Sequence, residues 1–251
     1  TGGSVADNIT TTVPSGVIRA YDLSNGKLLW AWEPVIAVTE SGKAASEAGD
    51  NPANAPLNAD TPRYQQGTTN SWSYLSVDPE LGLVYVPTGN TSPDYYGGHR
   101  GNLDHYSSSV VALSIETGDV VWHFQTVHHD IWDFDAPNPV VLFDLDYNSV
   151  PRKGLAQAGK TGWVYILDRI SGEPLVGIDE RPVPQEPRQA TAATQPYPAG
   201  DSFVSQTLDI PPEGFRLVNN GAIFTPFWED PVLLRRSEAN WPPSTVTQLK
   251  E

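Results

Sequence analysis

The chain of 251 residues contains no cysteine and no methionine. Without cysteine there is no disulfide framework, no thiolate metal site and no cysteine nucleophile. Without methionine there is no initiator residue, so we expect a processed product or an internal fragment of a longer protein. No apolar run approaches the roughly 18 residues of a membrane span, and no charged-then-apolar signal segment opens the chain. We therefore expect no membrane contact within this segment.

Basic residues are also scarce. Lys and Arg together number 15 against 30 Asp and Glu, which gives a formal net charge of −15. Nucleic acids and anionic membrane surfaces both reward clustered Lys and Arg, so this composition argues against either as a partner. Long helical periodicity is rare as well. Short alternating or β-branched runs that end in turn residues predict an all-β chain instead.

A strand–turn–strand phrase recurs along the chain. Each copy has a first strand, a tight turn with a glycine where a positive φ is needed, and a second strand. The three copies, of which the third is the weakest, span residues 16–30, 109–122 and 162–176. In the first two copies a tryptophan, Trp30 or Trp122, follows the turn glycine by four residues, whereas the third has Val176 there. We expect each tryptophan to dock between neighbouring sheets.

Residues 72–126 combine a further strand–turn–strand pair with the second copy, which predicts one four-stranded unit. Repeated four-stranded sheets with a periodic Gly and Trp motif are typical of a β-propeller. A β-sandwich with similar turns is the alternative. It is disfavoured because sandwich strands do not normally repeat a whole Asp-x-x-x-Gly-x-x-x-Trp phrase.

The number of repeats predicts a partial propeller of about three blades. Propellers typically have roughly four to eight blades and must close on themselves to protect their edge strands. We therefore expect residues 1–251 to be a fragment of a single propeller domain. The expected blade parts, followed by a region of long loops and the start of further blades, are about 1–34, 72–126, 127–180 and 181–251.

Three phrases resemble one known family: Asn70-Ser-Trp72, Pro87-Thr-Gly-Asn90, and Gln125-Thr-Val-His-His-Asp-Ile-Trp-Asp133. They are similar to those of the pyrroloquinoline-quinone (PQQ) dehydrogenases, of the membrane-bound glucose, quinate and polyol type and related quinoprotein alcohol dehydrogenases. The resemblance extends from residue 2 to about residue 243. It implies an eight-bladed propeller in the parent protein, with the cofactor near the central axis.

The same resemblance implies an oxidoreductase that oxidises a sugar, polyol or other alcohol by hydride transfer to PQQ. The implied partners are a small-molecule alcohol or sugar as substrate and a quinone or cytochrome as electron acceptor. The implied location is the bacterial periplasm or another extracytoplasmic space. Any membrane anchor would lie in a segment outside this chain.

Asp133 matches the catalytic base of the family. Alcohol oxidation needs a carboxylate that takes the hydroxyl proton while hydride leaves the carbon atom. The residue types alone leave open whether Asp133 is a base or an aspartate that caps a loop or pairs with a cation.

Trp72 and Lys160 match the cofactor-binding residues of the family. A planar tricyclic quinone needs a flat aromatic face, which Trp72 would supply by offset stacking. The Lys160 ammonium group would stabilise negative charge on the quinone oxygens during reduction. The alternatives are a core tryptophan and a solvated surface lysine.

Asn90 and Asp7 match metal ligands of the family, and Asn8 is a weaker candidate ligand. The resemblance also implies that Asn90 binds the cofactor. Ca²⁺ and Mg²⁺ both prefer oxygen ligands, so the residue types do not distinguish them. Such an ion would act as a Lewis acid on the quinone. A turn residue is the alternative role for Asn90.

A propeller that only binds or assembles other molecules is the alternative function. Such a scaffold keeps the repeats but needs neither a base nor cofactor and metal ligands. The five positions whose joint presence favours the enzyme are Asp7, Trp72, Asn90, Asp133 and Lys160.

Overall fold

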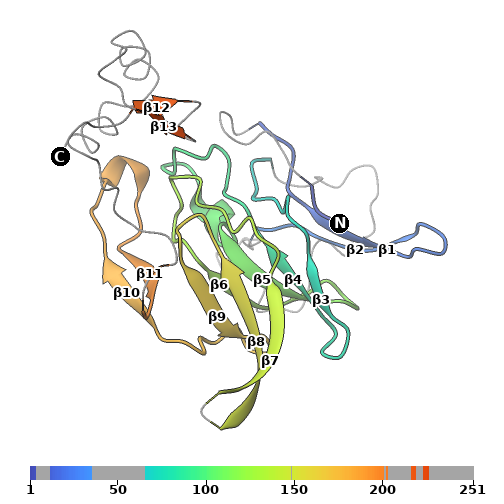
Figure 1. Cartoon of the computed structure of the whole chain (residues 1–251). Coiled ribbons are helices and arrows are strands. Elements are labelled where there is room, and N and C mark those ends of the chain that lie inside the picture. Colours follow the sequence, from blue (N-terminus) through green and yellow to red (C-terminus); the bar gives the residue numbers. More distant parts are fainter. Residues whose placement is uncertain are drawn as a thin grey trace, which may run out of the picture. The chain divides into compact units, whose positions relative to one another are not determined.

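The computed structural model describes residues 1–3, 12–35, 66–147, 149–200, 202, 216–218 and 223–225. The chain divides into two compact units, Thr1–Val204 and Ser205–Glu251. The described residues form short antiparallel strands and two 3-10 turns, η3 (Gly101–Asp104) and η4 (Pro187–Gln189) (Figure 1). The all-β fold class predicted from the sequence is confirmed. No helix in these ranges is long and apolar enough to cross a membrane.

The described residues of the first unit form four sheets that follow one another along the chain (Figure 1). The first sheet pairs β1 (Ile18–Tyr21) with β2 (Leu28–Trp32). The second contains β3 (Ser76–Asp78), β4 (Leu83–Pro87), β5 (Ser109–Ser114) and β6 (Val120–Gln125), in that order. The third contains β7 (Val141–Tyr147), β8 (Val150–Ala158) and β9 (Val164–Asp168). The fourth pairs β10 (Ile178–Pro182) with β11 (Thr194–Pro198).

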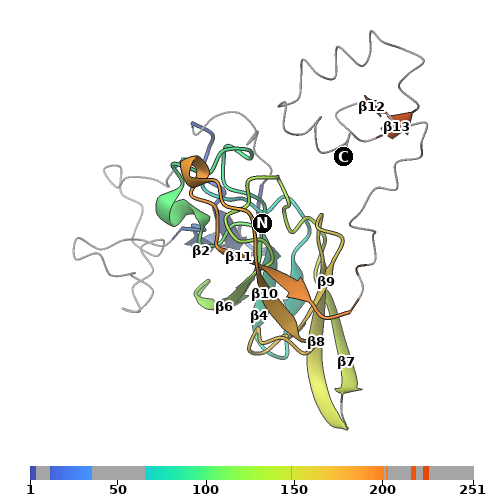
Figure 2. The ribbon, with the colours of Figure 1, turned by 90° about the vertical axis from the view of Figure 1, so that its left-hand side faces the viewer.

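The second unit is described only at two short strands. They are β12 (Arg216–Val218) and β13 (Ile223–Thr225), which pair antiparallel. In the first unit, β7 and β8 continue beyond the other sheets as a long two-stranded projection (Figure 2).

The region expected to consist of long loops begins with a hairpin. Strand β11 pairs with β10 across a register that places Pro196 opposite Glu180 and Pro198 opposite Ile178. Proline cannot donate a ladder hydrogen bond, so it is confined to edge strands and strand ends. A two-stranded sheet has only edge strands, and β11 therefore tolerates the prolines that suggested a loop.

The four-stranded sheet is buried on both faces. Alternate side chains along a strand point to opposite faces, so β4 and β5 each supply two sets of apolar residues. One set packs toward β1 and β2, in a cluster of Ile18, Trp30, Trp32, Val84, Val86, Tyr106, Val111 and Leu113. The other packs toward the third sheet, in a cluster of Leu83, Tyr85, Val110, Ala112, Trp122, Val140, Leu155 and Leu167.

The predicted docking of the repeat tryptophans is confirmed. The Trp30 ring covers Gly118 so closely that a methyl group there would lie 2.6 Å from ring atoms. Its Nε1 donates a hydrogen bond to the Ile115 carbonyl at 2.8 Å. Trp122 covers Gly172 in the same way, again at 2.6 Å. Each tryptophan therefore joins its own sheet to the turn of the next sheet.

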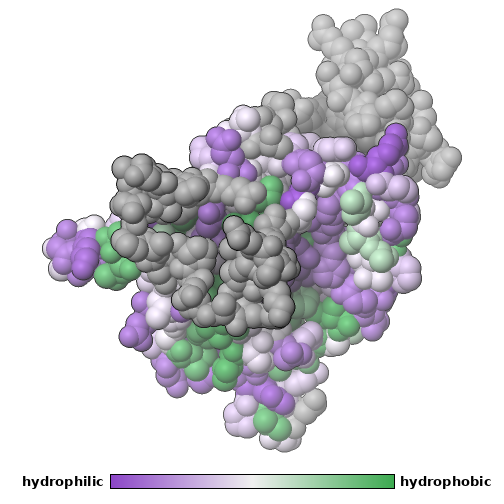
Figure 3. All heavy atoms as spheres, turned by 180° about the vertical axis from the view of Figure 1, so that it is seen from behind, coloured by the Kyte–Doolittle hydropathy of each residue, from purple (hydrophilic) through white to green (hydrophobic). Residues whose placement is uncertain are grey.

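Hydrophobic residues are not confined to the two cores. Figure 3 shows them in patches among hydrophilic residues on the face seen from behind. Several of the exposed apolar side chains belong to strands, among them Leu29, Val77, Val121 and Val141.

Candidate functional site

Loops from several sheets meet at one edge of the first unit. In an antiparallel sheet the starts of alternate strands lie beside the ends of the strands between them. Trp72 precedes β3, Asn90 follows β4 and Asp133 follows β6. Lys160 lies in the turn that connects β8 to β9. The topology therefore brings these four predicted residues to the same edge.

Lys160 bridges two carboxylates. Its Nζ lies 2.9 Å from Oδ1 of Asp133 and 2.7 Å from Oδ2 of Asp135. The second carboxylate oxygen of Asp135 accepts a hydrogen bond from the backbone N–H of Asn90 at 2.6 Å. Asp135, which the sequence did not single out, thus links Asn90 to Lys160, and Lys160 in turn binds Asp133.

The two aspartates differ in exposure. The side chain of Asp133 is 27% exposed, whereas that of Asp135 is 6% exposed. Burial raises the pKa of Asp135 well above the usual range of an aspartate, although the Lys160 ammonium group acts against it. For Lys160, burial would lower the pKa, but hydrogen bonds to Asp135 and Asp133 outweigh it and raise the pKa. Lys160 therefore remains a cation, and Asp133 is the carboxylate that a solute can reach.

Trp72 lies beside this group. A side chain at Gly89 would meet Oδ1 of Asp135 at 3.2 Å and Nε1 of Trp72 at 3.4 Å, so both groups border the same glycine. Trp72 is 45% exposed, which a core tryptophan would not be. Its indole can therefore offer an aromatic face to a ligand.

Asn90 is 1% exposed, and both Oδ1 and Nδ2 of its carboxamide are hydrogen-bonded to protein groups. Its Oδ1 accepts hydrogen bonds from the Thr91 backbone N–H at 2.8 Å and from Ser107 Oγ at 3.2 Å. Its Nδ2 donates to the Asp94 carbonyl at 2.9 Å. A metal ion could bind Oδ1 only by replacing one of these donors, so Asn90 does not present a ready ligand in this arrangement.

The other predicted metal ligands, Asp7 and Asn8, lie outside the described residues. Within the described part of the chain, no three His, Cys, Asp or Glu side chains are grouped so that they could hold a metal ion.

Asp135 and Tyr95 are the residues at this edge that sequence reasoning missed. Burial raises the pKa of the Tyr95 phenol, and the negative charge of Asp133 raises it further, which indicates that the two groups lie near each other. The Asp133-Phe-Asp135 spacing was the only available signal for Asp135. It could not show that the second carboxylate would be buried against Asn90.

Together, these observations describe an all-β protein whose neighbouring sheets are joined by the rings of Trp30 and Trp122. Lys160 and its two carboxylates lie at one edge of these sheets. Residues 1–214 match the family model described as "PQQ: Glucose/ethanol/alcohol dehydrogenase, beta-propeller domain". The chain belongs to this PQQ β-propeller family, which confirms the resemblance found in the sequence.

Two curated relatives illustrate the similarity. The glycerol dehydrogenase large subunit of Gluconobacter oxydans is 39% identical over 78% of this chain and 25% of its own length. The quinoprotein glucose dehydrogenase of Escherichia coli is 37% identical over 83% of this chain and 24% of its own length. The chain therefore spans about a quarter of the length of these relatives.

A solved structure shows the same fold relationship. The quinohemoprotein alcohol dehydrogenase of Comamonas testosteroni matches with a TM-score of 0.51 and 28% sequence identity. That match covers 67% of this chain and 25% of the other chain.

Proposed function

We propose that this chain forms part of the cofactor pocket of a PQQ-dependent dehydrogenase that oxidises a sugar, polyol or other alcohol. The observation that carries the proposal is the Lys160 ammonium group between Asp133 and Asp135, with the exposed Trp72 bordering the same glycine as Asp135. Relatives with this domain include proteins named as glycerol and glucose dehydrogenases.

The residues at this edge suit a planar quinone. Trp72 offers an aromatic face for offset stacking. Lys160 is a partly exposed cation that can donate a hydrogen bond to an anionic oxygen, since its side chain is 34% exposed. When bound, PQQ would supply the hydride acceptor for alcohol oxidation.

Asp133 is the proposed general base. A partly exposed carboxylate can accept the proton of a substrate hydroxyl while hydride leaves the carbinol carbon, which becomes a carbonyl carbon. The bond from Lys160 to Oδ1 fixes the orientation of this carboxylate. Asp135, which is buried, holds Lys160 from the other side and would not itself meet the substrate.

The metal site stays a prediction. Asp7, Asn8 and Asn90 remain the proposed ligands of a Ca²⁺ or Mg²⁺ ion, and Asn90 would have to exchange the hydrogen bond from Ser107 or Thr91 for that ion. The electron acceptor, a quinone or cytochrome, and an extracytoplasmic location also remain proposals. So does the assignment of residues 1–251 to one propeller domain.

The test uses the complete protein that contains this chain, produced without cofactor. We expect dye-linked oxidation of some member of a panel of sugars and alcohols, only after PQQ and Ca²⁺ are added. Asp133→Asn should lower kcat by about 100-fold or more, because general-base catalysis typically contributes 10²–10⁴-fold. Binding of PQQ, followed by quenching of tryptophan fluorescence, should persist in the variant. A protein that binds no PQQ at all would instead be a propeller scaffold.

A further inference from the structure

We propose that Arg100 is a positioning residue, which locks the loop that carries Asp133 onto the loop that carries Asn90. The inference rests on the proposed function, since it assigns Arg100 a role in the placement of the proposed base. Arg100 itself is remote from solvent and would touch neither substrate nor cofactor, because its side chain is 0% exposed.

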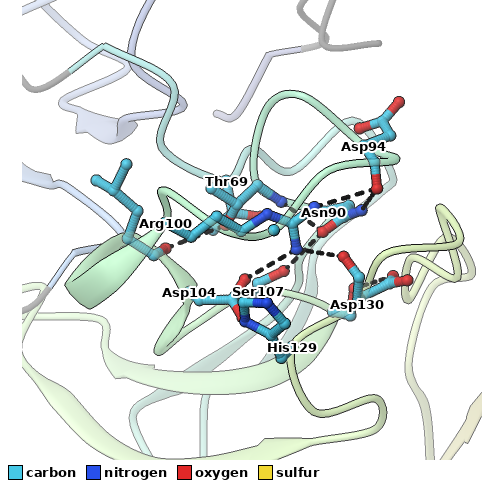
Figure 4. Close-up of polar contacts among 12 residues, drawn as sticks. Thr69, Asn90, Asp94, Arg100, Asp104, Ser107, His129 and Asp130 are labelled. Atoms are coloured by element: carbon cyan, nitrogen blue, oxygen red, sulfur yellow. Dashed lines mark hydrogen bonds and ion pairs between the residues drawn. The ribbon is translucent and has the colours of Figure 1, made fainter. Parts of the chain in front are cut away.

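The guanidinium group of Arg100 joins three separate segments (Figure 4). Its Nη2 donates to the carbonyls of Pro93 at 3.0 Å and Asp94 at 3.1 Å. Its Nη1 donates to the carbonyl of Asp130 and lies 3.3 Å from the Asp104 carboxylate. One side chain therefore binds the loop after β4, the loop after β6 and the turn η3.

One arm of this network leads to Asp133. The Asp130 carboxylate accepts hydrogen bonds from the backbone N–H groups of Trp132 at 2.9 Å and Phe134 at 2.7 Å. Ser108 Oγ donates to the same carboxylate at 2.7 Å. Asp133 lies between these two N–H groups with a φ of 62°, a left-handed conformation that is uncommon for a non-glycine residue and that aspartate tolerates better than most.

The other arm leads to Asn90. The Asp94 carbonyl, which accepts the bond from Arg100, also accepts the bond from Asn90 Nδ2. The Asn90 backbone N–H in turn holds Asp135, and Asp135 holds Lys160. Arg100 thus connects the two arms. One arm leads through Asp130 to the loop of Asp133, and the other leads through Asn90 to Asp135.

Only arginine suits this position. The planar guanidinium group presents donors in a rigid fork and so can reach carbonyls on two loops at once, whereas an ammonium group is a compact point charge on a flexible stem. A buried charge is also costly unless it is paired and hydrogen-bonded. The contacts with Asp104 and three carbonyls meet that requirement at Nη1 and Nη2, whereas Nε has no hydrogen-bond partner among the described residues.

The test is Arg100→Lys in the complete protein, with Arg169→Lys as the matched control. Arg169 is also buried and bonded to an aspartate, Asp78, at 2.7 Å, but it joins β3 and β7 rather than the loops of the site. We expect Arg100→Lys to lower kcat by about 10- to 100-fold, because small misplacements of a catalytic group have effects of this size. KM and the affinity for PQQ, measured by fluorescence titration, should change by less than about threefold.

Thermal unfolding separates positioning from a general loss of structure. Both variants should lower Tm, but Arg169→Lys should leave kcat unchanged. Because Arg100→Lys could fail to fold, Ser108→Ala provides a milder second variant, which removes only the hydroxyl group that binds Asp130. It should lower kcat by about fivefold with KM unchanged, since one hydrogen bond typically contributes about 1 kcal/mol and about 1.36 kcal/mol is tenfold in rate.

The outcomes distinguish this inference from the proposed function. A wild-type protein that neither binds PQQ nor oxidises any alcohol overturns both. If the wild type is active and Arg100→Lys and Ser108→Ala keep its kcat, the positioning role of Arg100 is wrong while the proposed function stands. Equal losses of kcat in Arg100→Lys and Arg169→Lys would also reduce Arg100 to a structural residue.

Discussion

At the candidate site, the positively charged side chain of Lys160 lies between the carboxylates of Asp133 and Asp135. Each bond from Lys160 is charge-assisted, and such bonds are stronger than those between neutral groups. The arrangement stabilises the ammonium form of Lys160 and holds Asp133 in place. It also explains how the chain accommodates Asp135, whose burial would otherwise be unfavourable for a carboxylate.

The first residue-scale prediction concerns Lys160. Lys160→Met leaves two carboxylates without their shared cation and should weaken PQQ binding by about 10- to 100-fold, since hydrogen bonds to charged groups contribute about 1.5–3 kcal/mol. Fluorescence titration with PQQ measures the effect. Lys153→Met is the control, because Lys153 forms its ion pair with the exposed Glu80 rather than with the carboxylates of the candidate site. Unaltered PQQ affinity in Lys160→Met would remove Lys160 from the cofactor site.

A second residue-scale prediction concerns pH. The hydrogen bond from His129 Nδ1 to Asp104 at 2.8 Å raises the pKa of His129, although burial and the charge of Arg100 oppose it. A group whose pKa is raised on folding contributes stability that is complete below its unfolded pKa, about 6.5, and that is lost as pH rises through the folded pKa. His129→Gln should therefore lower the free energy of unfolding more at pH 6 than at pH 8.

His123 provides the opposite case. Burial, together with the neighbouring His105, lowers the pKa of His123 to about 4. This group opposes folding increasingly as pH falls from about 6.5 toward that value. His123→Phe should therefore make the protein less sensitive to acid over this range, as followed by denaturant unfolding. The same pH slope for the His129 and His123 variants would contradict both assignments.

At the scale of elements, the repeated turn joins neighbouring sheets through one glycine and one tryptophan. Gly118 has a φ of 76° and Gly172 a φ of 77°, which only glycine adopts without strain. The same two glycines leave room for the Trp30 and Trp122 rings. A single residue type thus meets a backbone requirement and a packing requirement.

This double role predicts the cost of substitution. Gly118→Ala should lower the free energy of unfolding by about 1–2 kcal/mol because of the positive φ. Overlap of the new methyl group with Trp30 should lower it by about 1–3 kcal/mol more. Gly82→Ala isolates the backbone contribution, because Gly82 has a φ of 67° and no described residue within 4 Å of an added methyl group. Chemical unfolding of both variants measures the difference, and equal losses would show that Trp30 tolerates the extra methyl group.

At the scale of the whole molecule, the four described sheets of the first unit follow one another along the chain. Gly26, with a φ of 72°, occupies the same place in its turn as Gly118 and Gly172, but no described residue lies within 4 Å of a methyl group added there. The exposed apolar residues on β2, β6 and β7 belong to the same sheets. The two relatives described above are about three times as long as this chain.

We predict that a tryptophan from a segment outside the described residues covers Gly26 in the complete protein. Gly26→Ala should then destabilise the complete protein as much as Gly118→Ala and more than Gly82→Ala. Thermal unfolding of the three variants gives the comparison. A loss equal to that of Gly82→Ala would show that the Gly26 turn remains uncovered.

The sequence by itself predicted the sheets built on the repeated phrase, though not the β10–β11 hairpin, and it singled out candidate site residues that lie in local motifs. Strand alternation, turn glycines and the Gly-x-x-x-Trp phrase are local signals. They therefore predicted the strands of the repeated phrase and the docking of Trp30 and Trp122 between neighbouring sheets. The phrases around Trp72, Asn90 and Asp133 were recognisable for the same reason. Only the tertiary structure decided that Asp135 meets Lys160, 25 residues away, and Asn90, 45 residues away. Likewise, only folding assembles the contacts of Arg100 with two loops. Burial and the meeting of distant loops depend on how sheets pack, and no local pattern of residues records that.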